Sequence, residues 1–223
     1  MNKKTILALV MVFLAATGVF AQYAGFSIGG GGFIGGELGG GIQITDPSGT
    51  TGTIKIPYFG GGGYIFLDIP YAEFYTGFFG GGGKIEISGG GTSISQDMSF
   101  MSLNIGLLGK YPFNIAHNMA IFPMLGLEYQ IMLSAQNSDG IQYKNPKNKE
   151  SPGDFSALWV KFGGGMDYFF NRNDYLRVEA LYAVRFANQV ENDMKNQYTP
   201  YAKDVKTLLG NGPTIKIGFG YKF

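Results

Sequence analysis

The chain has 223 residues, a length that single β-barrel domains often reach. Its formal net charge is +1, so it lacks the basic excess that is typical of nucleic-acid binding proteins, and we expect no nucleic-acid partner. Glycine accounts for 37 residues without a collagen-like period, and aromatic side chains make up 15%, which is too many for a disordered chain. Cysteine is absent and His117 is the only histidine, so we expect no disulfide, metal site or cofactor.

The first 21 residues have the three parts of a secretory signal peptide. Lys3 and Lys4 form a positive start, an uncharged apolar run follows, and Val19-Phe20-Ala21 resembles a cleavage site. A membrane anchor is the alternative, but the run is short for a helix that must cross about 30 Å of hydrocarbon. The sequence therefore predicts a cleaved signal peptide over 1–21 and one β-barrel domain over 22–223.

After residue 21, apolar residues alternate with small or polar ones, which is the pattern of half-buried β-strands. The C-terminus is the clearest case, because Ile215, Ile217, Phe219 and Tyr221 share one face of a predicted strand. Counted in this way, the sequence predicts eight strands, near 23–32, 57–68, 72–88, 97–111, 119–135, 155–169, 174–187 and 213–223.

The predicted connections alternate between long and short along the chain. The long ones are 33–56, 89–96, 136–154 and 188–212. An even number of strands with every second connection short is typical of a transmembrane barrel, in which the short turns face the periplasm and the long loops face outside. The fold class expected is therefore all-β, an eight-stranded antiparallel up-and-down transmembrane barrel.

The third predicted strand contains a change in its alternation. Phe74 and Phe78 occupy even positions, whereas Ile85 and Ile87 occupy odd ones, and a run of four glycines separates the two pairs. A β-bulge within Gly80–Gly83 would account for the change, so a bulge is predicted there.

Alternation does not by itself distinguish a membrane barrel from a soluble barrel with an apolar interior. One face carries long aliphatic and aromatic groups on nearly every strand, and aromatic residues gather near the strand ends, as expected at membrane interfaces. A Lys or Arg facing lipid at the midplane would cost about 2–4 kcal/mol. We therefore expect the opposite face, with its charges, to line the lumen: Lys84, Glu86, Glu128, Lys161, Asp167, Arg177, Glu179, Arg185 and Lys216.

The last eight residues carry a resemblance to a known family. They match, at Lys216, Gly218, Tyr221 and Phe223, the C-terminal assembly signal of bacterial outer-membrane barrels. Together with the signal peptide and the strand count, the chain resembles the small barrels of the OmpA-domain, OmpX and OmpW kind, without a motif for one subfamily. This resemblance implies integral residence in the outer membrane, contact with its lipid, and recognition by the β-barrel assembly machinery during biogenesis.

Six predicted lumen charges come from three consecutive strands: Glu128, Lys161, Asp167, Arg177, Glu179 and Arg185. Their shared parity suggests an ion-pair network, with Lys161 near Glu128 and Arg177 near Asp167. An eight-stranded barrel is just wide enough for side chains to fill it, so a structural plug is favoured over an ion pathway.

Two functions remain open from the sequence. One is a surface or structural interaction module, whose long charged loops contact an extracellular ligand of unspecified chemistry. The alternative is a narrow porin-like or OmpW-like conduit for small hydrophobic molecules, since inward glycines (Gly163, Gly165, Gly218, Gly220) could leave a cavity lined by Trp159 and Met132. An enzyme is not expected, because His117 falls in a predicted periplasmic turn as a solvated residue without a catalytic partner.

Overall fold

The computed structural model describes residues 25–138, 140, 156–188, 199 and 201–223. The predicted signal peptide lies outside these residues, as do most of the predicted loop at 136–154 and residues 189–198 and 200 of the predicted loop at 188–212. No helix in the described part of the chain is long and apolar enough to cross a membrane.

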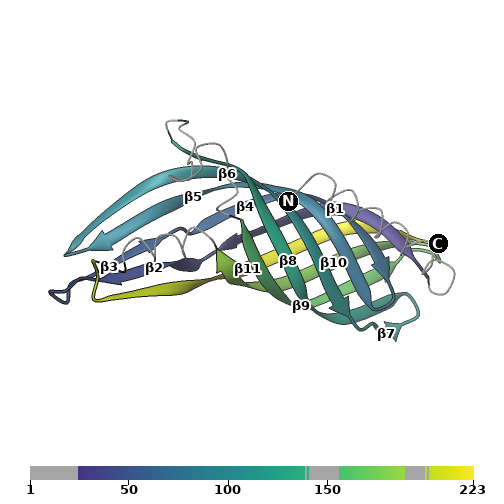
Figure 1. Cartoon of the computed structure of the whole chain (residues 1–223). Helices are drawn as coiled ribbons and strands as arrows, with labels where there is room; N and C mark the ends of the chain where they lie inside the picture. The colour runs from purple at the N-terminus through teal and green to yellow at the C-terminus, as the bar shows by residue number, and fades with distance from the viewer. Residues whose placement is uncertain (1–24, 139, 141–155, 189–198, 200) are drawn as a thin grey trace, which may run out of the picture.

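Eleven strands make up the described chain (Figure 1). They are β1 (Ser27–Glu37), β2 (Gly39–Thr45), β3 (Thr51–Lys55), β4 (Tyr58–Ile69), β5 (Ala72–Gly89), β6 (Thr92–Lys110), β7 (Phe113–Ala116), β8 (Met119–Asn137), β9 (Ala157–Phe169), β10 (Asp174–Asn188) and β11 (Asp204–Lys222). Every pairing between them is antiparallel.

Eight of these strands close into a ring, in the order β1-β4-β5-β6-β8-β9-β10-β11 and back to β1. The closing pair joins the first strand to the last, from Ser27 opposite Lys222 to Gly35 opposite Thr214. The predicted eight-stranded antiparallel barrel is therefore confirmed.

The connections differ from the prediction, because the strands are longer than expected on one side of the ring. The segment 33–56, predicted as a loop, continues β1 and then forms the β2–β3 hairpin, and 89–96 contains only a two-residue turn at Gly90 and Gly91. Residues 204–212 are likewise part of β11 rather than a loop. Strands of 18 or 19 residues exceed the 9–11 that cross a bilayer, so their outer ends project beyond it.

These outer ends pair as a sheet in the order β11-β2-β3-β5-β6, which we call the sheet extension (Figure 1). The extension comprises residues 39–55, 84–97 and 204–210. Gly40 and Gly41, with φ of 141° and 145°, allow the backbone to bend where β1 passes into β2. The pairing of β11 with β2 also shifts register nearby, between Leu208 and Asn211.

The predicted bulge at Gly80–Gly83 is wrong. Both neighbours of β5 pair with it without a register shift through this run, so odd-numbered residues face inward along the whole strand. What changes is the polarity of the two faces. Phe78 faces outward in the ring, whereas Lys84 faces outward in the extension and Ile85 packs inward against buried apolar residues. The expectation that Lys84 and Glu86 line the lumen is corrected accordingly.

The outward face of the ring is apolar. Ile65, Leu125 and Phe219, on three different strands, are 61%, 62% and 64% exposed. A continuous band of this kind is expected against lipid, with hydrogen-bonded backbone and no open edge. Three aromatic residues near strand ends that were expected at the membrane interface, Tyr58, Phe169 and Tyr175, instead pack in the lumen.

The two ends of the ring can be told apart. The C-terminus and the turns 70–71, 111–118 and 170–173 share one end, and the sheet extension lies at the other. In transmembrane barrels the short turns face the periplasm. We therefore refer to the end with the short turns as the periplasmic end.

Candidate functional site: the charged lumen

The strands of the ring carry eleven buried charged side chains into the lumen. They are Glu37, Asp68, Glu73, Lys110, Glu128, Lys161, Asp167, Arg177, Glu179, Arg185 and Lys216. Each lies at the inward parity of its strand, opposite lipid-facing apolar neighbours. Six carboxylates face five cations, so the charge is balanced to within one unit. Buried ions require such balance, because an uncompensated one is strongly destabilising.

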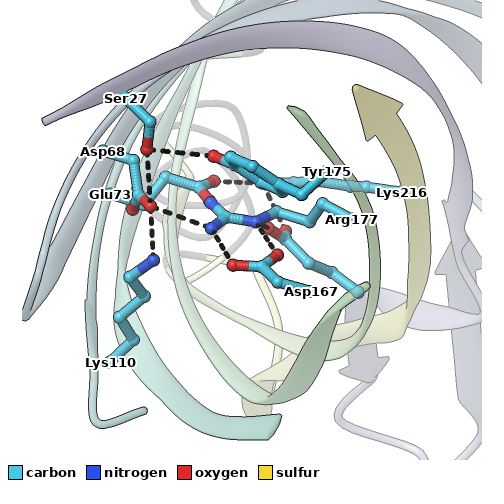
Figure 2. Close-up of polar contacts among 9 residues, drawn as sticks. Ser27, Asp68, Glu73, Lys110, Asp167, Tyr175, Arg177 and Lys216 are labelled. Carbon is cyan, nitrogen blue, oxygen red and sulfur yellow. Dashed lines mark hydrogen bonds and ion pairs between the residues drawn. The ribbon is translucent and has the colours of Figure 1, made fainter. Parts of the chain in front are cut away.

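Arg177 of β10 lies at the centre of this network and its side chain is 0% exposed (Figure 2). Its Nε and Nη2 atoms donate to the two oxygens of Asp167 at 2.7 Å each, which is the bidentate pairing that guanidinium geometry favours. Nη1 donates to Glu73 at 2.7 Å and Nη2 also donates to Asp68 at 2.8 Å. The guanidinium therefore ties β10 both to its neighbour β9 and, across the lumen, to β4 and β5.

A second group of charges surrounds Lys216 of β11. Its ammonium lies 3.2 Å from Glu73 and 3.0 Å from Glu179. The same ammonium lies 3.4 Å from the ring centre of Tyr75, which is a cation–π contact. Since Glu73 contacts both Arg177 and Lys216, the two groups form one network rather than two.

Lys110 joins this network from the periplasmic side. Its ammonium donates to Asp68 at 2.6 Å, and Asp68 also accepts from the Ser27 hydroxyl at 3.4 Å. The Tyr175 hydroxyl donates to Ser27 at 3.0 Å, as Figure 2 shows. Strand β1 is thereby connected to β4, β6 and β10 inside the ring.

A polar layer lies next to this network on the side of the sheet extension. Lys161 donates to Glu128 at 2.8 Å, and the Tyr75 hydroxyl donates to the same carboxylate at 2.6 Å. Beside them, Trp159 donates to the Gln130 side-chain oxygen at 3.1 Å. Buried hydrogen-bonded groups of this kind hold their side chains in one arrangement.

Arg185 is separate from the other five predicted lumen charges. It pairs with Glu37 of β1 at 3.1 Å, and its guanidinium lies 5.9 Å from the ring centre of Trp159. The structure thus brings Glu128 and Lys161 together, and Asp167, Arg177 and Glu179 together, with Arg177 3.9 Å from Glu179.

Five charged partners were not among the six residues singled out from the sequence: Glu37, Asp68, Glu73, Lys110 and Lys216. Lys216 was expected to face the lumen, but its partners were not identified. Asp68 and Glu73 flank a short turn, where a charge also suits solvent. Their parity, opposite to that of the apolar neighbours Leu67 and Phe74, is the signal that could have identified them.

Aromatic rings fill the space above most of the inward glycines. A side chain at Gly165 would collide with the Phe122 ring, one at Gly218 would meet the Tyr64 hydroxyl, and one at Gly220 would collide with the Tyr175 ring. The cavity expected from these glycines is therefore absent at all three positions. Met132 packs in a separate apolar cluster with Phe79, Met98 and Phe100.

Trp159 does line a hollow in the lumen, together with Phe33, Glu128 and Lys161. Its volume is about 30 Å³. A single water molecule needs roughly 10–15 Å³ by the same measure, so there is room for about two. In the described part of the chain, no group of three or more Asp, Glu or His side chains is arranged to hold a metal ion.

Three of the four residues of the C-terminal assembly signal lie on β11, and Phe223 follows its last residue. Lys216 and Gly218 face the lumen, whereas Tyr221 and Phe223 are exposed, with ring centres 5.0 Å apart. Their role in assembly stays a prediction. His117 is exposed at the periplasmic end, in the turn between β7 and β8.

No protein-family model and no curated protein matches this sequence. Among solved structures, the chain is similar to the outer membrane protein OprG from Pseudomonas aeruginosa, at 15% identity over 90% of this chain and 96% of that one, with a TM-score of 0.46. Neisserial surface protein A gives 12% identity over 89% and 97%, with a TM-score of 0.44. The outer membrane protease OmpT from Escherichia coli gives 9% identity over 89% of this chain and 97% of that one, with a TM-score of 0.44.

The class of the barrel follows from its own surfaces. An apolar band surrounds a closed ring of strands, and the charged side chains are enclosed and paired within it. The chain is therefore an integral β-barrel of the outer-membrane type.

Proposed function

We propose that this protein is a closed outer-membrane anchor that holds the sheet extension outside the cell as an interaction surface. The observation that carries the proposal is the outward face of the extension, which is polar across all five strands. One row of paired residues runs Lys206, Gln43, Thr53, Ser88 and Ser93, and each of these is at least partly exposed.

The inward face of the extension has the opposite character. Ile42, Ile54, Ile87 and Ile94 pair in one row across four strands; Ile42 is only 1% exposed, whereas Ile87 and Ile94 are 48% and 68% exposed. This is the pattern of a sheet in water, with one apolar face and one solvated face. It supports a paired sheet in solvent where the sequence predicted long loops at 33–56 and 89–96.

The lumen supports an anchor in preference to a conduit. Arg177, Glu73 and Asp167 meet across the interior at 2.7 Å, and the hollow beside Trp159 is of the size of water molecules. A solute that passed through the ring would have to separate buried ion pairs, which is costly.

The test has two parts. Purified protein in planar lipid bilayers should give no steady ion conductance, and uptake of a hydrophobic fluorescent dye should be the same in cells with and without the gene. Steady conductance, or dye uptake that depends on the protein, would favour the conduit and overturn the proposal.

The second part concerns the polar face. Thr53→Arg with Ser88→Arg places two bulky charges on opposed residues of β3 and β5. Cells with the wild-type protein should adhere to surfaces coated with extracellular-matrix protein, with polysaccharide or with the purified barrel, and the double variant should lose that adhesion. Asn114→Arg with Ala116→Arg, exposed at the periplasmic end, adds the same charge and serves as the control. Equal adhesion of all three proteins on every surface would contradict the proposal.

A further inference from the structure

A hollow of about 690 Å³ lies at the periplasmic end, outside the lumen network. It is lined by the turn that joins β7 to β8 and the turn that joins β9 to β10, together with Lys222 at the end of β11. Ligand sites commonly measure roughly 300–1,000 Å³, so the hollow is large enough to receive a small molecule or a lipid headgroup.

Among the described residues, basic side chains line this hollow and no Asp or Glu does. His117, Arg172 and Lys222 line it, and its other polar side chains are the phenol of Tyr168 and the amides Asn114, Asn118 and Asn171. Within the described ranges, the side chains of His117, Arg172 and Lys222 make neither an ion pair nor a hydrogen bond. In the part of the chain that the structure describes, no carboxylate or carbonyl occupies their donors.

The acid nearest in sequence to Arg172, Asp174, does not line the hollow. Asp174 accepts a hydrogen bond from the Asn171 side-chain amide at 2.6 Å. The Asn171 side-chain oxygen accepts from the backbone of Asn173 and of Asp174 at 2.8 Å each. The Asn173 side-chain amide donates to the backbone oxygen of Lys222 at 2.6 Å. These contacts fix the turn that carries Arg172 against the residue that carries the second cation.

The hollow also borders the lipid-facing band. Tyr168 and Phe170 belong to its lining and are 36% and 57% exposed on the outside of the barrel. The Phe170 ring lies 6.5 Å from that of Phe219, a residue of the apolar band. An aromatic residue at such a boundary sits at headgroup level. A molecule in the hollow would therefore have cations on one side and acyl chains on the other.

We propose that this hollow is a binding site for a phosphate group, supplied by a phospholipid headgroup of the periplasmic leaflet. Arg172 and Lys222 provide the charge, the Asn side chains provide neutral donors, and Tyr168 and Phe170 contact the glycerol and acyl region. Arginine matches phosphate with a planar pair of donors, and lysine adds a point charge. The site is independent of the proposed extracellular function, because it lies at the opposite end of the barrel.

The single histidine provides a direct measurement, since the imidazole signal of His117 is the only one of its kind in the NMR spectrum. The refolded full chain in neutral maltoside micelles is titrated with three probes: short-chain phosphatidylglycerol, inorganic phosphate, and short-chain diacylglycerol, which lacks the phosphate. The proposal expects a saturable shift of the His117 signal with phosphatidylglycerol and none with diacylglycerol. Saturation with phosphatidylglycerol but not with inorganic phosphate supports the lipid source.

Variants decide whether the cations carry the binding. Arg172→Gln with Lys222→Gln should weaken the apparent affinity for phosphatidylglycerol by roughly tenfold or more, as expected when two charge-assisted hydrogen bonds are lost. Lys55→Gln with Lys206→Gln removes the same charge from the sheet extension and should leave the affinity unchanged. Saturation by inorganic phosphate with equal strength would overturn the lipid source. An unsaturable shift, or equal affinity of both double variants, would overturn the site itself.

Discussion

At the scale of single residues, Arg177 is the clearest point at which to test the lumen. Arg177→Ala would leave Asp167, Glu73 and Asp68 buried beside one another without the cation that now lies within 2.8 Å of each. Removing one member of a buried ionic group costs about 3–5 kcal/mol. We expect a loss of that size in the free energy of unfolding, measured by urea denaturation of protein refolded into lipid vesicles.

A control substitution distinguishes the effect of losing a buried cation from the effect of losing any cation. Lys206→Ala removes a cation whose side chain is 68% exposed, and which lies 3.3 Å from Asp204. An exposed pair of this kind contributes at most about 1 kcal/mol, so little change is expected. If Arg177→Ala cost no more than Lys206→Ala, the buried network would not stabilise the fold.

Glycine substitutions test how tightly the lumen is filled. At Gly106 an added methyl group would collide with the Tyr75 ring, whose hydroxyl donates to Glu128. At Gly82, which faces outward, the nearest atom is a backbone oxygen at 3.6 Å, which is ordinary contact. Gly106→Ala should cost about 1–3 kcal/mol, whereas Gly82→Ala should be neutral or slightly stabilising. The same urea titration measures the unfolding free energy of both variants. Equal losses would show that the lumen has room for an added methyl group at Gly106.

Residue parity explains which lumen contacts were predictable. Lys161 and Glu128 share the inward face of adjacent strands, so the sequence suggested their proximity. Arg177 and Glu73 are 104 residues apart and meet from strands that do not pair with each other. Such a contact depends on the diameter of the ring and on side-chain length, which alternation along one strand does not encode.

At the scale of elements, β5 marks where the barrel leaves the membrane. Its outward residues change from Phe78 to Lys84 and Ser88 without a change in register. The predicted change in the alternation of apolar residues along β5 is present, but the predicted cause, a β-bulge, is wrong. A bulge and an exchange of environments give the same pattern, because either one moves the apolar residues from even to odd positions.

Cysteine labelling can locate this boundary, since the chain has no cysteine of its own. Ser88→Cys should react with a membrane-impermeant maleimide on intact cells, because the outward face of the extension lies in water. Phe78→Cys should resist labelling, because lipid covers it. Asn171→Cys, in an exposed turn at the opposite end, should react only after the outer membrane is permeabilised. Labelling of Phe78→Cys on intact cells, or of Asn171→Cys without permeabilisation, would contradict the assigned boundary or the orientation.

The segments mistaken for loops share a physical reason. Residues 39–55 are rich in glycine, threonine and isoleucine, and they lack the long lipid-facing side chains that identified the ring strands. Their pairing depends on β11 and β5, which are distant in sequence. An isolated hairpin is at best marginally stable, so the neighbouring strands decide whether such a segment forms a sheet.

At the scale of the whole molecule, the strands of the ring pair with one another without help from the sheet extension. Below the extension, β1 pairs directly with both β4 and β11, so the ring closes without β2 and β3. Glu37 lies opposite Tyr58 at the last pair of β1 and β4. A two-residue turn can join such a pair, and Asn-Gly is the preferred sequence for it.

Replacing residues 38–57 with Asn-Gly should therefore leave a folded barrel. We expect the variant to keep the faster migration of folded barrels on unheated electrophoresis gels. Its unfolding free energy should fall by roughly 2–4 kcal/mol, because the buried contacts of Ile42 and its neighbours are lost. Adhesion should disappear while bilayer conductance stays absent, since the ion pairs around Arg177 lie within the ring. Replacing only the turn 46–50 with the same two residues is the control and should retain adhesion. A chain that fails to fold without 38–57 would show that the extension is needed to close the ring, and that anchor and platform are one unit.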